Sequence, residues 1–138
     1  AKEFNKKVFD KINETFETNI NIDEVYKEKP KNIRIARKIF FNFDEYFSWP
    51  SLKNEIVSKT GFCYGLDSHF GILANGDVIP CCLDQNACIK LGNTNNTQLK
   101  DILNSKRVLD IQKGFKQNIL VEELCQKCEY RTRFDKKD

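Results

Sequence analysis

The sequence lacks methionine, has a single histidine, and contains no apolar run near the ~20 residues that a membrane-spanning helix requires. Its mean hydropathy is −0.57, and 31% of its residues are charged. These values predict a soluble globular protein without membrane partners, and 138 residues suffice for one domain with a core of its own. Because the chain opens at Ala1 and holds no methionine, we interpret it as an excised or processed fragment of a longer protein.

Charge of one sign is not concentrated anywhere along the chain. The net charge is +3, and basic and acidic residues are evenly mixed in both halves of the sequence. A surface that follows nucleic-acid phosphates needs clustered basic residues, so we expect no nucleic-acid partner. Residues 1–18 are charged and amphipathic and lack the apolar segment of a secretory signal, which favours a cytoplasmic location.

Recognisable catalytic motifs are also missing. The sequence shows no acid–base pair, no nucleophile elbow and no glycine-rich loop for phosphates. We therefore expect the isolated chain to be non-catalytic.

Cysteine, in contrast, is abundant and clustered in the last 76 residues. The six cysteines are Cys63, Cys81, Cys82, Cys88, Cys125 and Cys128. A disulfide framework, a structural zinc ion or an iron–sulfur cluster would each explain such clustering. Disulfides are the weakest explanation, because the chain is long enough to build a core and has no export signal.

The pair Cys125 and Cys128 forms the compact half of a metal site, since two intervening residues let both thiolates face one ion or cluster. Two further ligands must come from elsewhere. A zinc ribbon would supply a second pair with the same spacing, but Cys63 and Cys81 are separated by 17 residues. The spacing alone leaves zinc and iron–sulfur chemistry both open.

A hairpin is predicted between these upstream cysteines. Apolar residues at 70–74 and 77–82 flank Asn75-Gly76, a pair that favours a tight turn in which both residues have positive φ. The returning strand would bring Cys81 or Cys82 back to the level of Cys63. Neighbours on a strand face opposite sides, so only one of the two can face the site.

Cys88 is a weaker candidate for a ligand. It lies in a polar connection, at residues 84–90, where a loop or core role is more common. The cysteine of the 81–82 pair that faces away from the site would act as a small buried hydrophobe or a free thiol.

The order and spacing of these features resemble the SPASM or twitch domain at the C-terminus of many radical S-adenosylmethionine enzymes. The resemblance covers residues 61 to about 134. In its first half, twelve residues separate Cys63 from Gly76, and four residues separate Gly76 from Cys81. The second half of the pattern consists of Leu91-Gly92-Asn93, a helical stretch near Leu99 and Ile102, and Cys125-x-x-Cys128. It implies that Cys81 rather than Cys82 is a ligand. It also implies the shorter form of the domain, with one 4Fe–4S cluster held by Cys63, Cys81, Cys125 and Cys128.

This resemblance implies an auxiliary cluster with an electron-relay or structural role. The partner would be an upstream radical-enzyme barrel in the same parent chain, and the parent would act on a peptide or protein. The chain lacks the Cys-x-x-x-Cys-x-x-Cys motif of the cluster that cleaves S-adenosylmethionine. The alternative is a structural four-cysteine zinc module for protein interaction, and a sample prepared in air could carry zinc or disulfides.

The remaining segments predict an α+β fold. Phe4, Val8, Ile12 and Phe16 form a helical stripe with Phe9 beside it, and we expect this stripe to pack in the core. The alternation that begins at Ile33 predicts a strand at residues 33–43. The resemblance implies that residues 1–60 are the last helix–strand unit of a partial β/α barrel plus a linker, and that residues 61–138 form the cluster domain with its hairpin and helices.

In the C-terminal part, Thr97 is predicted to cap a helix that breaks at Asn104-Ser105. A second helix is predicted to continue to about residue 115, with Val108, Ile111 and Phe115 facing inward. We expect the charged residues 131–138 to be solvated.

Overall fold

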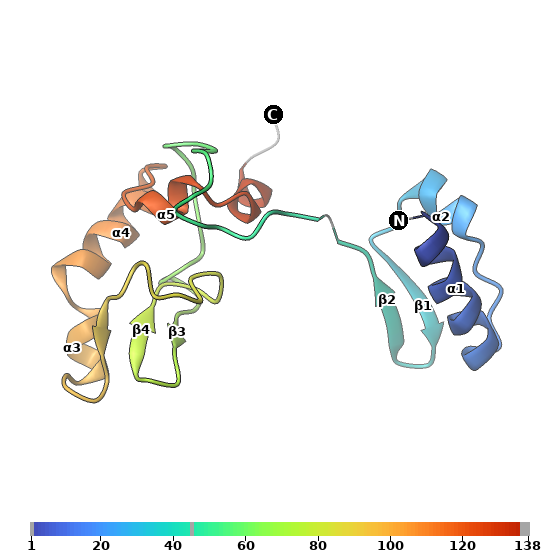
Figure 1. The fold of residues 1–138 in the computed structure, drawn as a ribbon, viewed down its shortest axis with the longest axis horizontal. Helices are drawn as coiled ribbons and strands as arrows, with labels where there is room; N and C mark the ends of the chain where they lie inside the picture. The colour runs from blue at the N-terminus through green and yellow to red at the C-terminus, as the bar shows by residue number, and fades with distance from the viewer. Residues whose placement is uncertain (1, 45, 136–138) are drawn as a thin grey trace. The chain divides into compact units, whose positions relative to one another are not determined.

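The computed structural model describes residues 2–44 and 46–135, and the chain divides into two compact units, Ala1–Tyr46 and Phe47–Asp138. Both units combine helices with a small antiparallel sheet, which confirms the predicted α+β class (Figure 1). Among the described residues, no helix is both long enough and apolar enough to cross a membrane. The predicted barrel origin of residues 1–60 stays a prediction.

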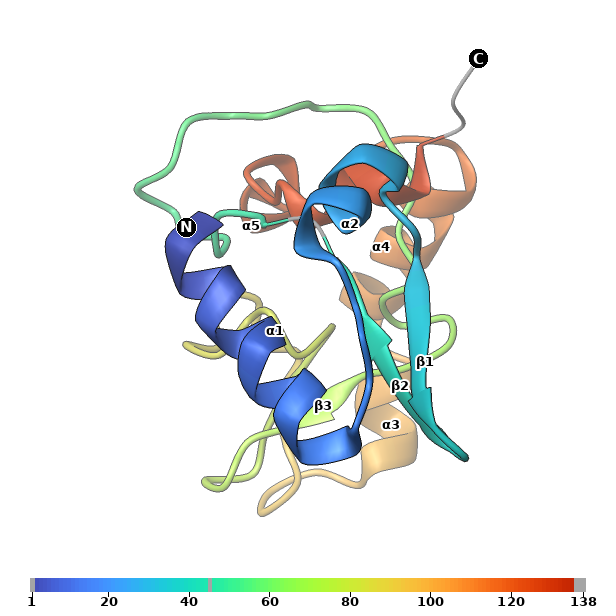
Figure 2. The same cartoon turned by 90° about the vertical axis from the view of Figure 1, so that its right-hand side faces the viewer.

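The N-terminal unit contains two helices and one hairpin, seen in Figure 2 as α1 and α2 with β1 and β2. Helix α1 spans Lys2–Phe16, α2 spans Ile22–Glu28, and strands β1 and β2 span Asn32–Ala36 and Ile39–Asn42. Helix α2 was not predicted, although Asn21 caps it by accepting a 2.9 Å hydrogen bond from the Asp23 backbone N–H.

Two predictions for this unit are wrong in detail. The centre of the buried face of α1 is Phe9, which is 5% exposed, whereas Phe4 is 70% exposed. The ring of Phe9 lies 5.3 Å from that of Phe41 and 6.1 Å from that of Phe43, so partners on the hairpin select the buried face. The single strand predicted at 33–43 is instead a hairpin that turns at Arg37. Both of its strands show the same alternation of period two, so the alternation does not reveal the turn between them.

The sheet of the C-terminal unit confirms the predicted hairpin and adds a third strand. Strands β3 (Gly71–Ile72), β4 (Asp77–Ile79) and β5 (Gly92–Asn93) are antiparallel in the order β3-β4-β5. The turn differs from the expected type, since Gly76 has a φ of +88° and Asn75 does not have a positive φ. The Gly76 N–H donates to the Leu73 carbonyl and closes a turn over residues 73–76. Gly76, the last residue of this turn, has the left-handed conformation.

The helices of this unit all follow its sheet in the sequence. They are α3 (Leu99–Leu103), α4 (Lys106–Lys116), α5 (Glu123–Gln126) and the short 3-10 helix η1 (Tyr130–Phe134). The predicted break at Asn104-Ser105 is confirmed. The predicted cap is wrong, because α3 begins after Gln98 rather than after Thr97.

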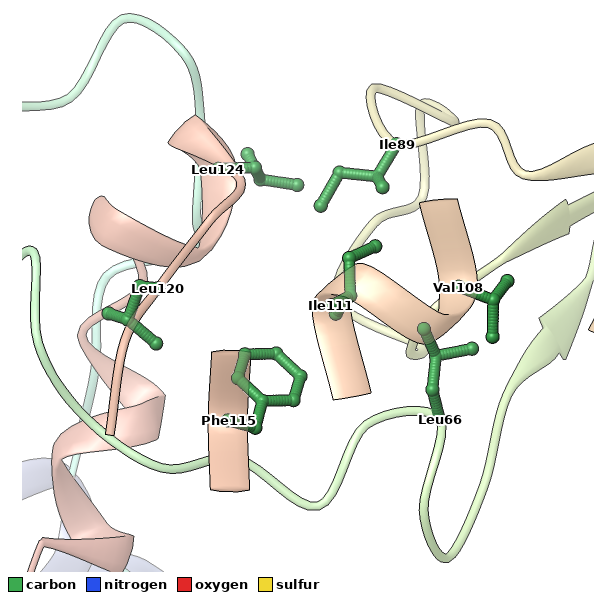
Figure 3. Close-up of a cluster of buried hydrophobic side chains, with 7 residues drawn as sticks. All are labelled: Leu66, Ile89, Val108, Ile111, Phe115, Leu120 and Leu124. Carbon is green, nitrogen blue, oxygen red and sulfur yellow. The ribbon is translucent and has the colours of Figure 1, made fainter. Parts of the chain in front are cut away.

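One apolar core holds the C-terminal unit together, and α4 supplies Val108, Ile111 and Phe115 to it as predicted (Figure 3). The other buried members of this cluster are Leu66, Ile89, Leu120 and Leu124. Cys63 and Cys125 are partly buried and pack against the same cluster. The core therefore anchors two of the cysteines that the sequence analysis selected.

Candidate functional site

Five cysteines line one cavity of about 450 Å³ in the C-terminal unit. They are Cys63, Cys81, Cys82, Cys125 and Cys128. The structure thus brings together the four predicted ligands from three separated stretches of chain. Cys88 lies elsewhere, in a smaller cavity that it shares with Asp84.

Each of the four cysteines is placed by a different local element. Cys63 lies in the segment that leads towards β3, and Cys81 follows Pro80 at the end of β4. Cys125 lies within α5, and Cys128 lies between α5 and η1. The hairpin returns the chain as predicted, which explains how Cys81 meets Cys63 without a Cys-x-x-Cys spacing.

Burial and mutual repulsion dominate the electrostatics of the four thiols. Burial raises the pKa of Cys63, Cys125 and Cys128 above the ordinary thiol value, and it raises the pKa of Cys81 to about 11. A smaller contribution comes from the charges of the other thiols, and it connects every pair among the four. The four sulfurs therefore form one electrostatically coupled group.

Backbone N–H groups partly offset this penalty by donating towards sulfur. The N–H of Gly65 lies 3.4 Å from the Sγ of Cys63 and lowers its pKa, as does the N–H of Tyr64. The N–H groups of Leu83 and Asp84 act in the same way on the pKa of Cys81. Such donors favour the thiolate, which is the form that ligates metals.

The two weaker candidates differ from this group. Cys82 and Cys88 are exposed, whereas the four coupled cysteines are partly buried. Cys82 lines the same cavity as its neighbour Cys81, so the prediction that only one of the two faces the site is wrong. The strand ends at Ile79, and strand alternation therefore does not apply to this pair. Burial and the pairwise coupling favour Cys81.

Arg131 is a site residue that the sequence analysis missed. The expectation that residues 131–138 are solvated is wrong for Arg131, which is 2% exposed and lines the cavity; residues 136–138 lie outside the described residues. Its guanidinium charge lowers the pKa of Cys63 and of Cys128. The apolar side chains of Tyr130 and Phe134, four residues apart, could have indicated that this segment packs.

Aromatic side chains form much of the remaining wall. The rings of Phe47 and Tyr130 lie 4.8 Å apart, and those of Tyr64 and Phe134 lie 5.0 Å apart. Trp49 donates from Nε1 to the Leu83 carbonyl at 3.1 Å. Residues 47–60, which the sequence analysis grouped with the N-terminal part, thus belong to the compact unit that contains the cysteines.

Comparison with known proteins identifies this unit. Residues 63–129 match the family model of SPASM, described as an iron–sulfur cluster-binding domain. No curated protein and no solved structure matches the chain. The match spans all six cysteines and confirms the resemblance seen in the sequence. Residues 63–129 of this chain are therefore similar to the SPASM family, whose model is described as an iron–sulfur cluster-binding domain.

Proposed function

We propose that the C-terminal unit holds one 4Fe–4S cluster through Cys63, Cys81, Cys125 and Cys128, and that the cluster serves a radical S-adenosylmethionine parent protein as an electron relay or structural support. The observation that carries this proposal is the coupled group of four partly buried thiols around one cavity. Cys82 and Cys88 are left outside the ligand set.

The placement of the four thiols around one cavity favours a cluster over a single zinc ion. Zinc–sulfur bonds of ~2.3 Å in a tetrahedron hold neighbouring sulfurs about 3.8 Å apart. Within residues 2–44 and 46–135, no three histidine, cysteine or acidic side chains converge closely enough to hold a single metal ion. A cluster binds each thiolate to a different iron, so it needs sulfurs around a cavity, as found here.

The surroundings of the thiols also fit a redox cluster. When bound, the cluster supplies one-electron transfer, and four protein thiolates leave no iron open for substrate. Aromatic side chains, among them Trp49, Tyr64 and Phe134, line the cavity around the sulfurs. The backbone N–H groups that face the sulfurs would stabilise negative charge on them.

The role in a parent protein rests on the family resemblance. A radical S-adenosylmethionine barrel in the same parent chain would be the partner of this domain, and a peptide or protein would be the substrate of the parent. We place the protein in the cytoplasm, where the free thiols that the cluster needs persist.

Reconstitution of the chain under strict anaerobiosis tests the cluster assignment. The protein is incubated with iron and sulfide, desalted, and examined for iron and sulfide content, visible absorption and electron paramagnetic resonance after reduction. We expect four irons and four sulfides per chain and a brown protein. A parallel incubation with zinc is the comparison, and stoichiometric colourless zinc binding with no iron uptake would favour the zinc module instead.

A further inference from the structure

The guanidinium of Arg131 occupies a space that only a glycine at position 61 leaves open. A Cβ at Gly61 would lie 1.9 Å from Nη1 and 2.5 Å from Cζ of Arg131, and the φ of Gly61 is +147°. A side chain at position 61 would therefore force the guanidinium to move. The backbone around Gly61 is shaped to hold a cation in the interior.

The buried cation is only partly compensated. Its Nη1 donates to Asp135 at 2.6 Å, but the Asp135 side chain is 44% exposed. The Nε of Arg131 is buried and has no hydrogen-bond partner among residues 2–44 and 46–135. Burying a charge and leaving a donor unpaired both destabilise the fold, so a further anionic acceptor is expected beside Arg131.

The location of Arg131 indicates what that acceptor is. Arg131 lies in η1, three residues after Cys128, and it lines the cavity of the thiols. Its backbone N–H donates to the sulfur of Cys128, and its charge acts on both Cys63 and Cys128. The side chain therefore lies beside the sulfurs on one side of the site.

We propose that Arg131 is the cationic positioning residue of this site: its Nε, which has no acceptor among the residues that the structure describes, donates to a sulfide of the bound cluster on the Cys63–Cys128 side, and its charge raises the reduction potential of that cluster. This inference rests on the proposed function, because it requires an iron–sulfur cluster in the cavity. Reduction adds one electron from an external reductant to the cluster, and no bond forms or breaks. A nearby fixed cation stabilises the added negative charge.

The first test is a redox titration of the reconstituted full chain in the Arg131→Leu and Arg131→Lys variants. We expect Arg131→Leu to shift the equilibrium towards the oxidised cluster at least tenfold, which corresponds to a midpoint potential about 59 mV more negative. Arg131→Lys keeps the charge but loses the planar fork of donors, so its shift should be smaller.

Arg133→Leu is the matched control. It removes the same charge from the same short helix, but the Cζ of Arg133 lies over the ring of Tyr130 at 4.3 Å and over that of Phe47 at 5.2 Å. We expect a smaller shift than in Arg131→Leu. Equal shifts in both Leu variants, or an unchanged potential in Arg131→Leu, would overturn the proposal.

A measurement on the wild-type protein covers the case in which Arg131→Leu fails to take up the cluster. Protein labelled with ¹⁵N only in arginine side chains is reduced and studied by pulsed electron paramagnetic resonance. We expect a weak coupling between an arginine nitrogen and the cluster spin, and we expect the Arg133→Leu variant to retain it. The absence of any coupling would refute Arg131 as the donor. Failure of the wild type itself to bind iron and sulfide would instead refute the proposed function.

Discussion

The carboxylate of Asp84 accepts a 2.8 Å hydrogen bond from the backbone N–H of Ile89. It also accepts a 2.7 Å bond from the N–H of Cys88, and its side chain is 1% exposed. This pair of bonds folds the loop after Cys81 into a compact turn and holds Ile89 in the core. Asp84 thus connects the end of β4, where the proposed ligand Cys81 lies, to the apolar core through Ile89.

Replacing Asp84 with alanine should lower the free energy of unfolding by about 2–4 kcal/mol, because the buried N–H of Ile89 and the partly buried N–H of Cys88 lose their acceptor. Urea unfolding of the reduced apoprotein measures the change. Asp110→Ala is the control, since the Asp110 side chain is 53% exposed and pairs with Lys106 on the surface of α4. Equal destabilisation by both substitutions would contradict the role assigned to Asp84.

Cys81→Ser should abolish stable cluster binding, whereas Cys82→Ser should retain most of it. Both residues line the cavity, but Cys81 is partly buried and coupled to the other three thiols, while Cys82 is exposed. Iron and sulfide content after anaerobic reconstitution and desalting gives the result. Equal losses in the two variants would disprove the choice of Cys81.

Cys88→Ser should leave cluster content close to that of the wild type. Cys88 is exposed, and it lines a different cavity from the four proposed ligands. Cys125→Ser and Cys128→Ser, measured by the same assay, should lose the cluster. A cluster lost only in Cys88→Ser would mean that Cys88 is the fourth ligand.

The reduced apoprotein should lose stability as the pH rises from 9 towards 11. Folding raises the pKa of Cys81 from 9.0 to about 11, mainly through burial, so in this window the unfolded chain releases a proton that the folded chain keeps. The protonated Cys81 thiol therefore stabilises the fold fully below pH 9, and this stabilisation is lost as the pH rises towards 11.

Denaturant unfolding at several pH values checks this dependence. Between pH 8 and pH 10 the wild type should lose about 1 kcal/mol more than Cys81→Ser, which has no thiol to ionise. Cys82→Ser serves as the control and should follow the wild type. Parallel curves for the wild type and Cys81→Ser would contradict the shift.

The reconstituted and chemically reduced chain should neither bind S-adenosylmethionine nor form 5′-deoxyadenosine. Binding of the amino and carboxylate groups of that cofactor needs an iron with an open position, and four cysteine ligands leave none. The measurement is 5′-deoxyadenosine production against a cluster-free sample. Turnover above this background would mean that one iron lacks a protein ligand.

Local sequence patterns predicted the hairpin, the face of α4 and the gathering of the cysteines. Each depends on neighbours along the chain: Asn75-Gly76 specifies a reversal, and Val108, Ile111 and Phe115 recur with the helical period. The predicted turn type was wrong, because Gly76 has a positive φ and Asn75 does not. The side chain of Asn75 instead accepts a 3.1 Å hydrogen bond from the Asp77 backbone N–H.

Contacts distant in sequence decided the rest. The buried face of α1 depends on rings at Phe41 and Phe43, and the burial of Arg131 depends on the space left by Gly61, 70 positions earlier. Charge patterns place an arginine near a chain end in solvent, because desolvating its guanidinium destabilises the fold unless partners gather around it. Those partners come from separate segments, and only packing brings them together. The sequence alone specified which thiols are available, whereas packing decided which of them face one cavity beside Arg131.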